Sequence, residues 1–230
     1  MMSHFDYGYF SFSRRGKNKF NPVKERKKLV KKRSVINKLL ANGMGKEFYD
    51  GKRLNGYAGF KYDGRWKIFL KKIIKRYKLN NKSRVLDIGA KKGFFMHDLK
   101  DLLPGIKIYG VEDHIYPINK AMKTVKKKIK LARFTDLNYK KNYFDFVHAH
   151  NSIYQYNLRD LMQIIKIISK ISKKSHITVP IYETDKDRIK FYNWTLTGTT
   201  ILSSYDWKIL FKYLKYKGDY YFSGPKSFGL

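Results

Sequence analysis

Residues 83–95, Ser-Arg-Val-Leu-Asp-Ile-Gly-Ala-Lys-Lys-Gly-Phe-Phe, restrict the fold more than any other stretch of the chain. A short apolar run ends at a turn with two glycines, and apolar residues at helical spacing follow over 94–103. This order predicts a strand, a tight loop and a helix, which is the opening of a βαβ unit. Gly89 allows a turn with positive φ, and its missing side chain lets a ligand approach the main chain. The N–H groups at the start of the helix favour a polar or anionic group on that ligand.

The carboxylate of Asp87, two residues before Gly89, indicates the kind of ligand. A loop that binds a dinucleotide presents N–H groups to a pyrophosphate, which a carboxylate would repel. Asp87 therefore suits a cofactor that has a cationic amino group and no phosphate. The next apolar run, 106–111, ends in Glu112, about 20 residues beyond Gly93, the interval at which an acid binds ribose hydroxyls.

Together these features resemble the class I S-adenosylmethionine-dependent methyltransferases, whose sequences carry a strand, an acid, spaced glycines and a second strand that ends in an acid. The resemblance covers roughly residues 56–222 and implies a doubly wound α/β fold with a mostly parallel seven-stranded sheet. It implies S-adenosyl-L-methionine as the cofactor, with its amino group held through Asp87 and its ribose bound by Glu112. The cofactor-binding residues that it implies in this part of the chain are Asp87, Gly89, Ala90, Gly93, Glu112 and Asp113.

Lys91 departs from this pattern because it stands in the place of the middle glycine. A lysine is compatible with the turn, but it makes the loop more crowded and more basic. A loop that binds phosphate therefore remains an alternative. A non-catalytic binding module, whose altered loop no longer binds the cofactor, is another.

The aromatic and glycine-rich segment 47–66 precedes a predicted helix over 67–77 and is typical of a shaped loop. Its Tyr-Asp-Gly-Arg-Trp block at 62–66 resembles a bacterial branch of these enzymes, in which such a segment folds over the cofactor. Arg65 is predicted to bind the methionine carboxylate, because a guanidinium fork matches a carboxylate. The alternative is a structural arginine that stacks on Trp66 or pairs with Asp63.

Residues 143–151 read as the fourth strand and its end. Ligands bind beyond the carboxyl ends of parallel strands, so His148, His150 and Asn151 are expected near the transferring methyl group. His148 and His150 share one side of the strand and are the predicted catalytic residues, as general base for an acceptor hydroxyl. The alternatives are a buried, hydrogen-bonded histidine for His148 and a residue that supports the cofactor for His150. Two histidines are too few for a closed metal site, so none is predicted.

The adenine contact is less well marked. The resemblance implies an acid just after the third strand, read at 129–134, but that position holds Arg133. Either Asp136 makes the contact or the main chain around Phe134 does.

Motifs that are absent from the sequence help to indicate the acceptor of the methyl group. The fourth strand is not followed by the Asn/Asp-Pro-Pro-aromatic motif of base and amide methyltransferases, nor does it end in the aspartate of RNA ribose methyltransferases. The chain has no cysteine, which argues against methylation at cytosine C5. A polar insertion at 183–200 offers an aromatic surface that suits a sugar or a small ring. Its candidate acceptor-pocket residues are Glu183, Asp185, Arg188, Tyr192 and Trp194. A small-molecule or saccharide acceptor, methylated at a hydroxyl, is therefore favoured.

The net charge of +33 would suit a nucleic acid or an anionic membrane as partner. Lysines spread along the whole chain favour biased amino-acid usage instead, because recognition of phosphates and bases relies on clustered arginine. Residues 22–42 read as one basic amphipathic helix, which either lies on anionic lipid or nucleic acid or packs on the main domain. An RNA methyltransferase that holds phosphates with this helix is the alternative function.

The chain divides into a basic N-terminal extension, 1–55, and a methyltransferase domain, 56–230. Residues 1–16 are expected to be poorly ordered, or ordered only on docking. No apolar run reaches the roughly 18 residues of a transmembrane helix, and the first residues lack signal-peptide order, so a cytoplasmic location is expected. Further helices are predicted over 118–128, 157–174 and 204–216, with strands over 176–182 and 220–222.

Overall fold

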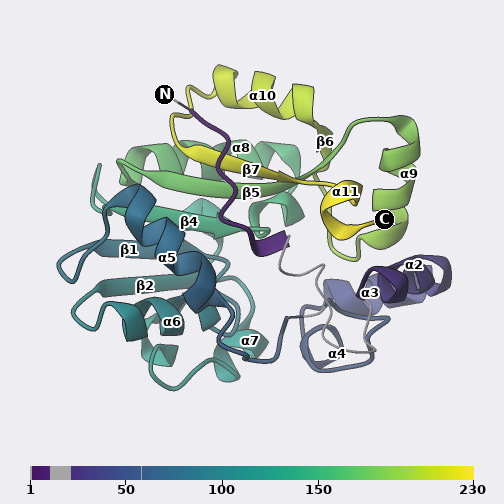
Figure 1. The fold of residues 1–230 in the computed structure, drawn as a ribbon, viewed down its shortest axis with the longest axis horizontal. Helices are drawn as coiled ribbons and strands as arrows, with labels where there is room; N and C mark the ends of the chain where they lie inside the picture. Colours follow the sequence, from purple (N-terminus) through teal and green to yellow (C-terminus); the bar gives the residue numbers. More distant parts are fainter. Residues whose placement is uncertain (1, 11–21, 58) are drawn as a thin grey trace.

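A parallel β-sheet with helices on both faces forms the centre of the computed structural model, which describes residues 2–10, 22–57 and 59–230 (Figure 1). The strands run in the order β3-β2-β1-β4-β5-β6, and β7 pairs with β5. Each strand pairing in the described part of the chain is parallel, which confirms the predicted doubly wound α/β fold. The strands are β1 (Arg84–Ile88), β2 (Lys107–Glu112), β3 (Ile129–Leu131), β4 (Phe146–His150), β5 (Ser175–Tyr182), β6 (Leu202–Ser203) and β7 (Asp219–Ser223).

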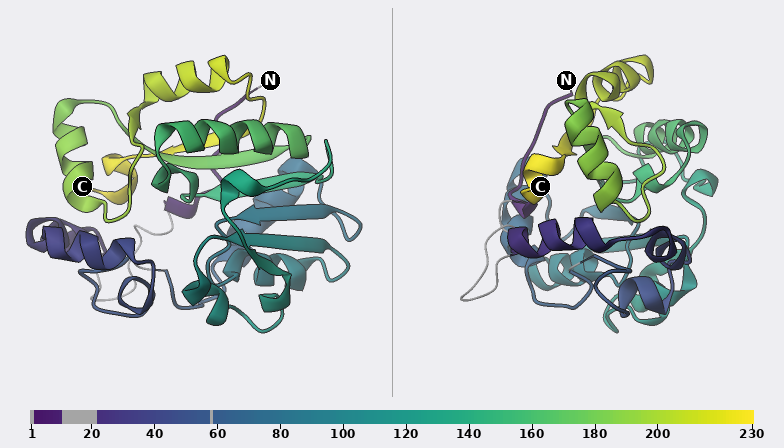
Figure 2. Two further views of the ribbon diagram at one scale, coloured as in Figure 1. Left: turned by 180° about the vertical axis from the view of Figure 1, so that it is seen from behind. Right: turned by 90° about the vertical axis from the view of Figure 1, so that its right-hand side faces the viewer.

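The helices lie along the edges and faces of this sheet, as the rotated views of Figure 2 show. They are α2 (Pro22–Lys32), α3 (Val35–Asn42), α4 (Lys46–Tyr49), α5 (Trp66–Tyr77), α6 (Phe94–Leu102), α7 (Ile115–Asn119), α8 (Leu158–Ile171), α9 (Asp185–Trp194), α10 (Ser204–Tyr213) and α11 (Pro225–Phe228). Short 3₁₀ turns occur at Lys126–Lys128, Phe134–Asp136 and Ile153–Gln155. None of the helices that the structure describes is long and apolar enough to cross a membrane.

Side chains alternate between the two faces of each strand, so the core has two layers, one on each face of the sheet. Leu86 and Ile88 of β1 pack with α8 and α10, whose Trp207 is fully buried. Val85 packs on the other face with α5 and α6. Because side chains alternate across a strand, Asp87 shares the face of Val85. His148 lies beside Asp87 in the register of β1 and β4, and it pairs in turn with His176 of β5. One face of the sheet therefore carries a row of one aspartate and two histidines.

Helix α8 shows how the sequence pattern sets this packing. Asn157 caps it by accepting a hydrogen bond from the backbone N–H of Asp160 at 3.0 Å, as Asn does at helix starts. Its buried stripe is Leu161, Ile164, Ile165, Ile168 and Ile171. Each such side chain contributes about 1.5–3 kcal/mol when fully buried.

The predicted helix over 118–128 is wrong. The chain forms the five-residue α7, then a turn and the 3₁₀ segment Lys126–Lys128. The backbone N–H of Met122 donates to the carbonyl of Lys92 at 3.0 Å, and Val125 is buried beneath the loop after β1. These tertiary contacts outweigh the local helical pattern.

The expectation that the first residues are poorly ordered is wrong for residues 2–10. They lie beside β7, where the Tyr220 N–H donates to Ser3 at 3.0 Å and the Phe5 N–H donates to Tyr220 at 2.9 Å. Tyr7 and Phe10 are each only 3% exposed. The rest of that expectation, 11–16, falls outside the described residues. In Figure 1 the purple segment of residues 2–10 crosses the front of the sheet.

Residues 22–42 form two helices rather than the single predicted one. The break falls at Arg33 and Ser34, where the Ser34 N–H donates to Asn37 Oδ1 at 2.8 Å. Leu29 of α2 packs with Phe191 and Trp194 of α9. The first of the two helices, α2, therefore packs on the main domain.

Candidate active site

The loop between β1 and α6 adopts left-handed backbone conformations at three positions. Gly89, Lys91 and Gly93 have φ of 78°, 52° and 73°. Glycine adopts this conformation readily, whereas a residue with a Cβ is destabilised there by about 1–2 kcal/mol. The loop therefore keeps the three-position geometry of the glycine pattern although lysine occupies the middle position.

The two glycines are also required by packing within the protein. A Cβ on Gly89 would lie 2.3 Å from the Cβ of Ser152, whose hydroxyl donates to the Ile88 carbonyl at 2.7 Å. A Cβ on Gly93 would lie 2.8 Å from Val125. The sequence predicts that a ligand approaches the main chain at Gly89, but Ser152 fills part of that space.

Three consecutive N–H groups of this loop, from Gly89 to Lys91, are bonded within the protein. Those of Gly89 and Ala90 donate to the Val111 carbonyl at 2.9 and 3.0 Å, and that of Lys91 donates to Glu112 Oε2 at 2.8 Å. A phosphate cradle needs free N–H groups. The loop is therefore poorly suited to the phosphate-binding alternative.

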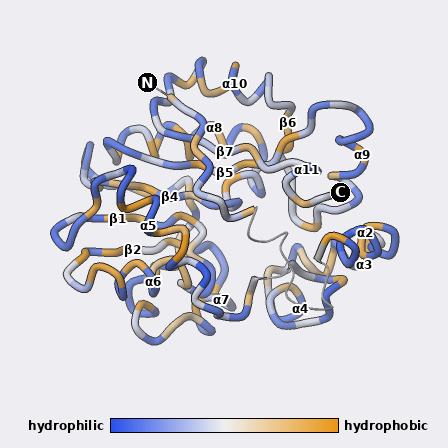
Figure 3. Tube along the Cα trace, in the orientation of Figure 1, coloured by the Kyte–Doolittle hydropathy of each residue, from blue (hydrophilic) through white to orange (hydrophobic). Residues whose placement is uncertain are grey.

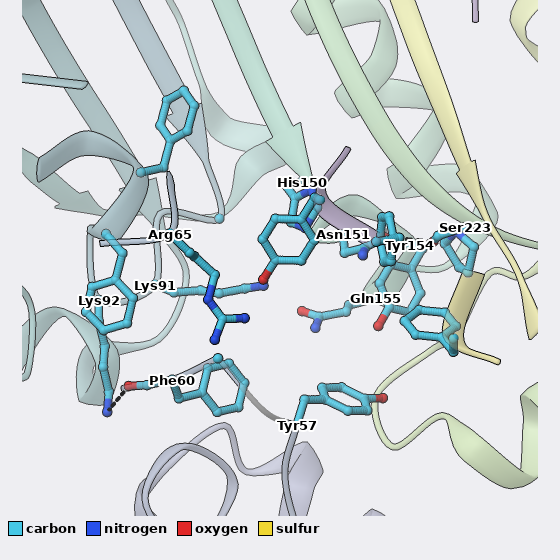
Figure 4. Close-up of a pocket in the computed structure, with 18 of the residues that line it drawn as sticks. Tyr57, Phe60, Arg65, Lys91, Lys92, His150, Asn151, Tyr154, Gln155 and Ser223 are labelled. Carbon is cyan, nitrogen blue, oxygen red and sulfur yellow. Dashed lines mark hydrogen bonds between the residues drawn. The ribbon is translucent and has the colours of Figure 1, made fainter. Parts of the chain in front are cut away.

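A cavity of about 290 Å³ opens beyond the carboxyl ends of β1 and β4 (Figure 4). It lies where ligands bind in open parallel sheets. The predicted site residues that line it are Arg65, Asp87, Gly89, Ala90, His148, His150 and Asn151. The structure thus gathers most of the predicted site in one place, with Gly93, Glu112, Asp113 and Asp136 outside the lining.

His148 and Asp87 form a buried pair at the floor of this cavity. His148 Nδ1 donates to Asp87 Oδ1 at 2.9 Å, and the imidazole stacks on Phe95 with a centroid distance of 4.1 Å. One carboxylate oxygen of Asp87 is therefore already bonded. His148 Nε2 has no hydrogen-bond partner in the part of the chain that the structure describes. His148 accordingly combines the buried, bonded histidine of the alternative reading with one open nitrogen.

His150 lies at the end of β4 against the N-terminal segment. Its Nδ1 is 2.5 Å from the Tyr7 hydroxyl, and the Tyr9 ring packs edge-on at 4.4 Å. Burial lowers the pKa of His150 well below its usual value, and the charges of His148 and Lys91 lower it further. Burial also raises the pKa of Tyr7. At neutral pH His150 is uncharged, as a general base must be before reaction.

Arg65 pairs with Asp63, as the structural alternative predicted, and its binding of the methionine carboxylate stays a prediction. It lines the cavity, and its Nε donates to the Asp63 carboxylate at 2.9 and 2.8 Å. The hydrogen bond with Asp63 raises the pKa of the guanidinium. Figure 4 shows its side chain directed into the space between the loop and Gln155.

Glu112 and Asp113 lie next to the loop. Glu112 is buried and accepts the Lys91 N–H, while Asp113 accepts hydrogen bonds from His114 Nδ1 at 2.6 Å and the Tyr156 hydroxyl at 2.6 Å. The ligand atoms of Glu112, Asp113 and His114 lie within 4.8 Å of one another, but these bonds to the protein already account for the cluster.

Neither adenine candidate reaches the cavity lining. Asp136 is exposed and accepts a hydrogen bond from Thr135 at 2.8 Å. Arg133, at the position implied for the acid, pairs with Asp160 at 3.0 Å. Phe134 is buried, and its N–H donates to the Tyr156 hydroxyl at 3.2 Å.

The Lys91 side chain lies inside the cavity (Figure 4). It makes no ion pair with any residue in the described ranges. Burial lowers the pKa of its ammonium, whereas the charges of Glu112 and Asp87 act in the opposite direction. These two carboxylates therefore stabilise a cation at this place, and that fits the amino and sulfonium groups of the implied cofactor.

The far end of the cavity has aromatic and cationic walls. Of the predicted acceptor residues, Trp194 lines it, whereas Glu183, Asp185, Arg188 and Tyr192 do not. Most of the insertion folds as α9, which leaves Asp185, Arg188 and Tyr192 exposed, and Glu183, just before it, is exposed too. Additional lining residues include Tyr57, Tyr154, Phe191, Arg26 and Arg53.

Sequence reasoning missed Tyr7, Tyr9 and Phe10. Phe5, Tyr7 and Tyr9 alternate with other residues, a period-two pattern typical of a half-buried extended segment. That pattern is the signal that could have placed the N-terminal segment against the sheet.

Comparisons with known proteins agree with this geometry. Residues 86–177 match the family described as "Methyltransferase domain". The YcgJ protein from Bacillus subtilis is 16% identical, with a TM-score of 0.52 over 63% of this chain and 66% of that one. A chain in the complex between the Haloferax volcanii Trm112 methyltransferase activator and a methyltransferase is 18% identical, with a TM-score of 0.51 over 66% of this chain and 72% of that one. No curated protein gives a significant match.

The likeness to these solved structures shows the fold, and this chain spans about two thirds of the first one's length. The match over residues 86–177, together with the sheet order, supports a methyltransferase domain of the S-adenosylmethionine-dependent kind in this part of the chain. S-adenosylmethionine is the cofactor of such a domain.

Proposed function

We propose that this protein transfers the methyl group of S-adenosylmethionine to a hydroxyl of a small molecule or sugar bound in the cavity. The observation that carries the proposal is the position of His150, neutral and at the cavity wall, beside the loop that follows β1. Asp87, Gly89, Ala90 and Arg65 would hold the cofactor, which supplies an electrophilic methyl group when bound. The block at 62–66, which we assign to a bacterial branch, contributes Arg65 and Trp66 to this wall.

His150 would take the proton of the acceptor hydroxyl at Nε2. For Nε2 to accept, Nδ1 must carry a hydrogen and donate it to the Tyr7 oxygen, 2.5 Å away. The phenol then stabilises the imidazolium that forms, because its oxygen accepts a charge-assisted hydrogen bond. Tyr9 and Phe10 also line the cavity and would shield this region from water.

The aromatic and cationic end of the cavity supports a ring-bearing acceptor. Tyr57 and Trp194 offer flat apolar faces, and Arg33 lies 4.2 Å over the Trp194 ring. Sugars and small aromatic rings both pack well on such faces.

Calorimetric titration with S-adenosylhomocysteine, the product of the cofactor, tests the first half of the proposal. We expect micromolar affinity, about −8 kcal/mol. Glu112→Gln should weaken it more than tenfold if Glu112 contacts the ribose, and unchanged affinity would remove Glu112 from the site. Absence of any binding by the folded wild-type protein would refute the methyltransferase function.

A further inference from the structure

Helix α3 presents its apolar side to solvent. Val35, Ile36, Leu39 and Leu40 are 69%, 61%, 61% and 43% exposed. Because an α-helix turns about 100° per residue, these four side chains lie on one side of it. Ala41, fully buried, lies on roughly the opposite side. An amphipathic helix packed on a domain normally has the reverse orientation.

Polar contacts hold α3 in this orientation. Asn37 Nδ2 donates to Asn55 Oδ1 at 2.8 Å, and Lys38 Nζ donates to the Tyr192 carbonyl at 2.8 Å. The apolar side chains therefore face outward because the opposite side of the helix is bonded to the body of the protein. Isolated exposed apolar residues are ordinary, but a group of them on one helix marks an interaction surface.

The helix just before it supplies positive charge. The exposed basic residues of α2 are Lys24, Lys27, Lys28, Lys31 and Lys32. Its one acid, Glu25, is half-buried and lies 3.8 Å from Arg53. Figure 3 shows hydrophilic and hydrophobic residues close together in the α2–α3 region, at the right of the molecule.

We propose that α3 and the lysines of α2 form a docking surface for an anionic lipid bilayer. Aliphatic side chains enter the boundary between headgroups and acyl chains, while nearby lysines attract anionic headgroups. Nucleic acid fits less well, because it would engage the lysines but leave the exposed valine, isoleucine and leucine side chains without an apolar partner. A second copy of the chain fits less well too, because one eight-residue helix is small beside the roughly 800 Å² per partner of a stable interface.

Co-sedimentation with lipid vesicles tests this surface. The full chain is mixed with vesicles of phosphatidylcholine alone or with vesicles containing about one third phosphatidylglycerol. We expect binding to the anionic vesicles only, with a decrease at high salt. The double variant Ile36→Asp/Leu39→Asp should lower the vesicle affinity by about tenfold or more. Ile209→Asp is the matched control, since Ile209 is 50% exposed on α10 and should leave binding unchanged.

Each other outcome overturns the proposal. Equal vesicle binding by the double variant would show that charge alone acts and that α3 does not contact lipid. No binding to either vesicle would exclude a membrane role. A wild-type dimer that the double variant converts to a monomer would assign the surface to a second copy. Salt-sensitive RNA binding without vesicle binding would assign the lysines to nucleic acid. S-adenosylhomocysteine titration of the same samples keeps this result separate from the proposed function.

Discussion

Lys91 combines an unfavourable backbone conformation with a cation inside the cavity. Its φ of 52° is one that glycine adopts at less cost, and its ammonium lies near Asp87 and Glu112. A cationic cofactor bound there would compete with the ammonium for the same two carboxylates. This residue therefore sets how strongly the site favours a cation.

Lys91→Gly should tighten S-adenosylmethionine binding by roughly tenfold, about 1.4 kcal/mol. S-adenosylhomocysteine lacks the sulfonium charge and should gain less. Calorimetry with both ligands measures the difference. Lys78→Gly is the control, because Lys78 also has a positive φ, 55°, but lies exposed at the end of α5. Equal affinities in wild type and Lys91→Gly would show that the ammonium does not share the cofactor's space.

We expect Tyr7 to bias which nitrogen of His150 carries hydrogen, because its hydroxyl lies 2.5 Å from Nδ1. Tyr7→Phe removes the only hydroxyl within 2.5 Å of Nδ1 in the structure's described ranges and should lower the free energy of unfolding by about 1–3 kcal/mol. Nitrogen-15 NMR of the imidazole should show a changed tautomer balance. Tyr213→Phe, at a tyrosine that is 70% exposed, should change neither quantity. An unaltered His150 spectrum in Tyr7→Phe would contradict a positioning role.

At the scale of the element, the N-terminal segment behaves as an added edge of the sheet. Ser3 Oγ donates to Asp219 at 2.6 Å, and His176 Nε2 donates to the Phe5 carbonyl at 2.9 Å. Removing residues 2–10 should lower the melting temperature and speed hydrogen exchange at the Tyr220 amide, which loses its acceptor on Ser3.

Exchange mass spectrometry and calorimetry measure these two effects. Full-length protein with Phe10→Ser is the companion sample, because it keeps the backbone pairing and loses only a buried ring. Protection of Tyr220 that survives the deletion would mean that the segment adds no strand-like support.

Local patterns in the sequence correctly identified the central strands, α8 and the loop after β1, because each depends on neighbours a few residues away. The prediction over 118–128 failed because the contact between Met122 and Lys92 decided the backbone there. The role of residues 2–10 was missed because their partner strand lies about 200 positions further along, as the Ser3–Asp219 separation of 216 shows. Most of the predicted residues that line the cavity could be found from the positions of the strand ends, whereas the residues that cover the cavity could not.

At the scale of the whole molecule, buried neutral histidines link stability to pH. Burial lowers the pKa of His176 to about 3 and that of His150 well below its usual value. Between pH 6.5 and about 3, the unfolded chain binds protons at these positions that the folded protein does not. The free energy of unfolding should therefore fall as the pH decreases below 6.5.

For His176 the loss between pH 7 and 5 should be on the order of 2 kcal/mol. Urea unfolding at both pH values measures it, and His176→Asn should reduce the pH dependence. A free energy of unfolding that stays constant or rises on acidification would mean that the histidines are charged in the folded protein. His114 loses its proton only at higher pH, because Asp113 and Glu112 raise its pKa to about 9.

The pairing of residues 2–10 with β7 also affects the order in which parts of the protein can fold during synthesis. A ribosome adds about 5–20 residues per second, so roughly 10–40 s separate the synthesis of Ser3 from that of Asp219. Until β7 emerges, Ser3 and Phe5 lack the Tyr220 main chain with which they pair. A nascent or prematurely terminated chain can thus form the central strands before the N-terminal segment is held against the sheet by β7.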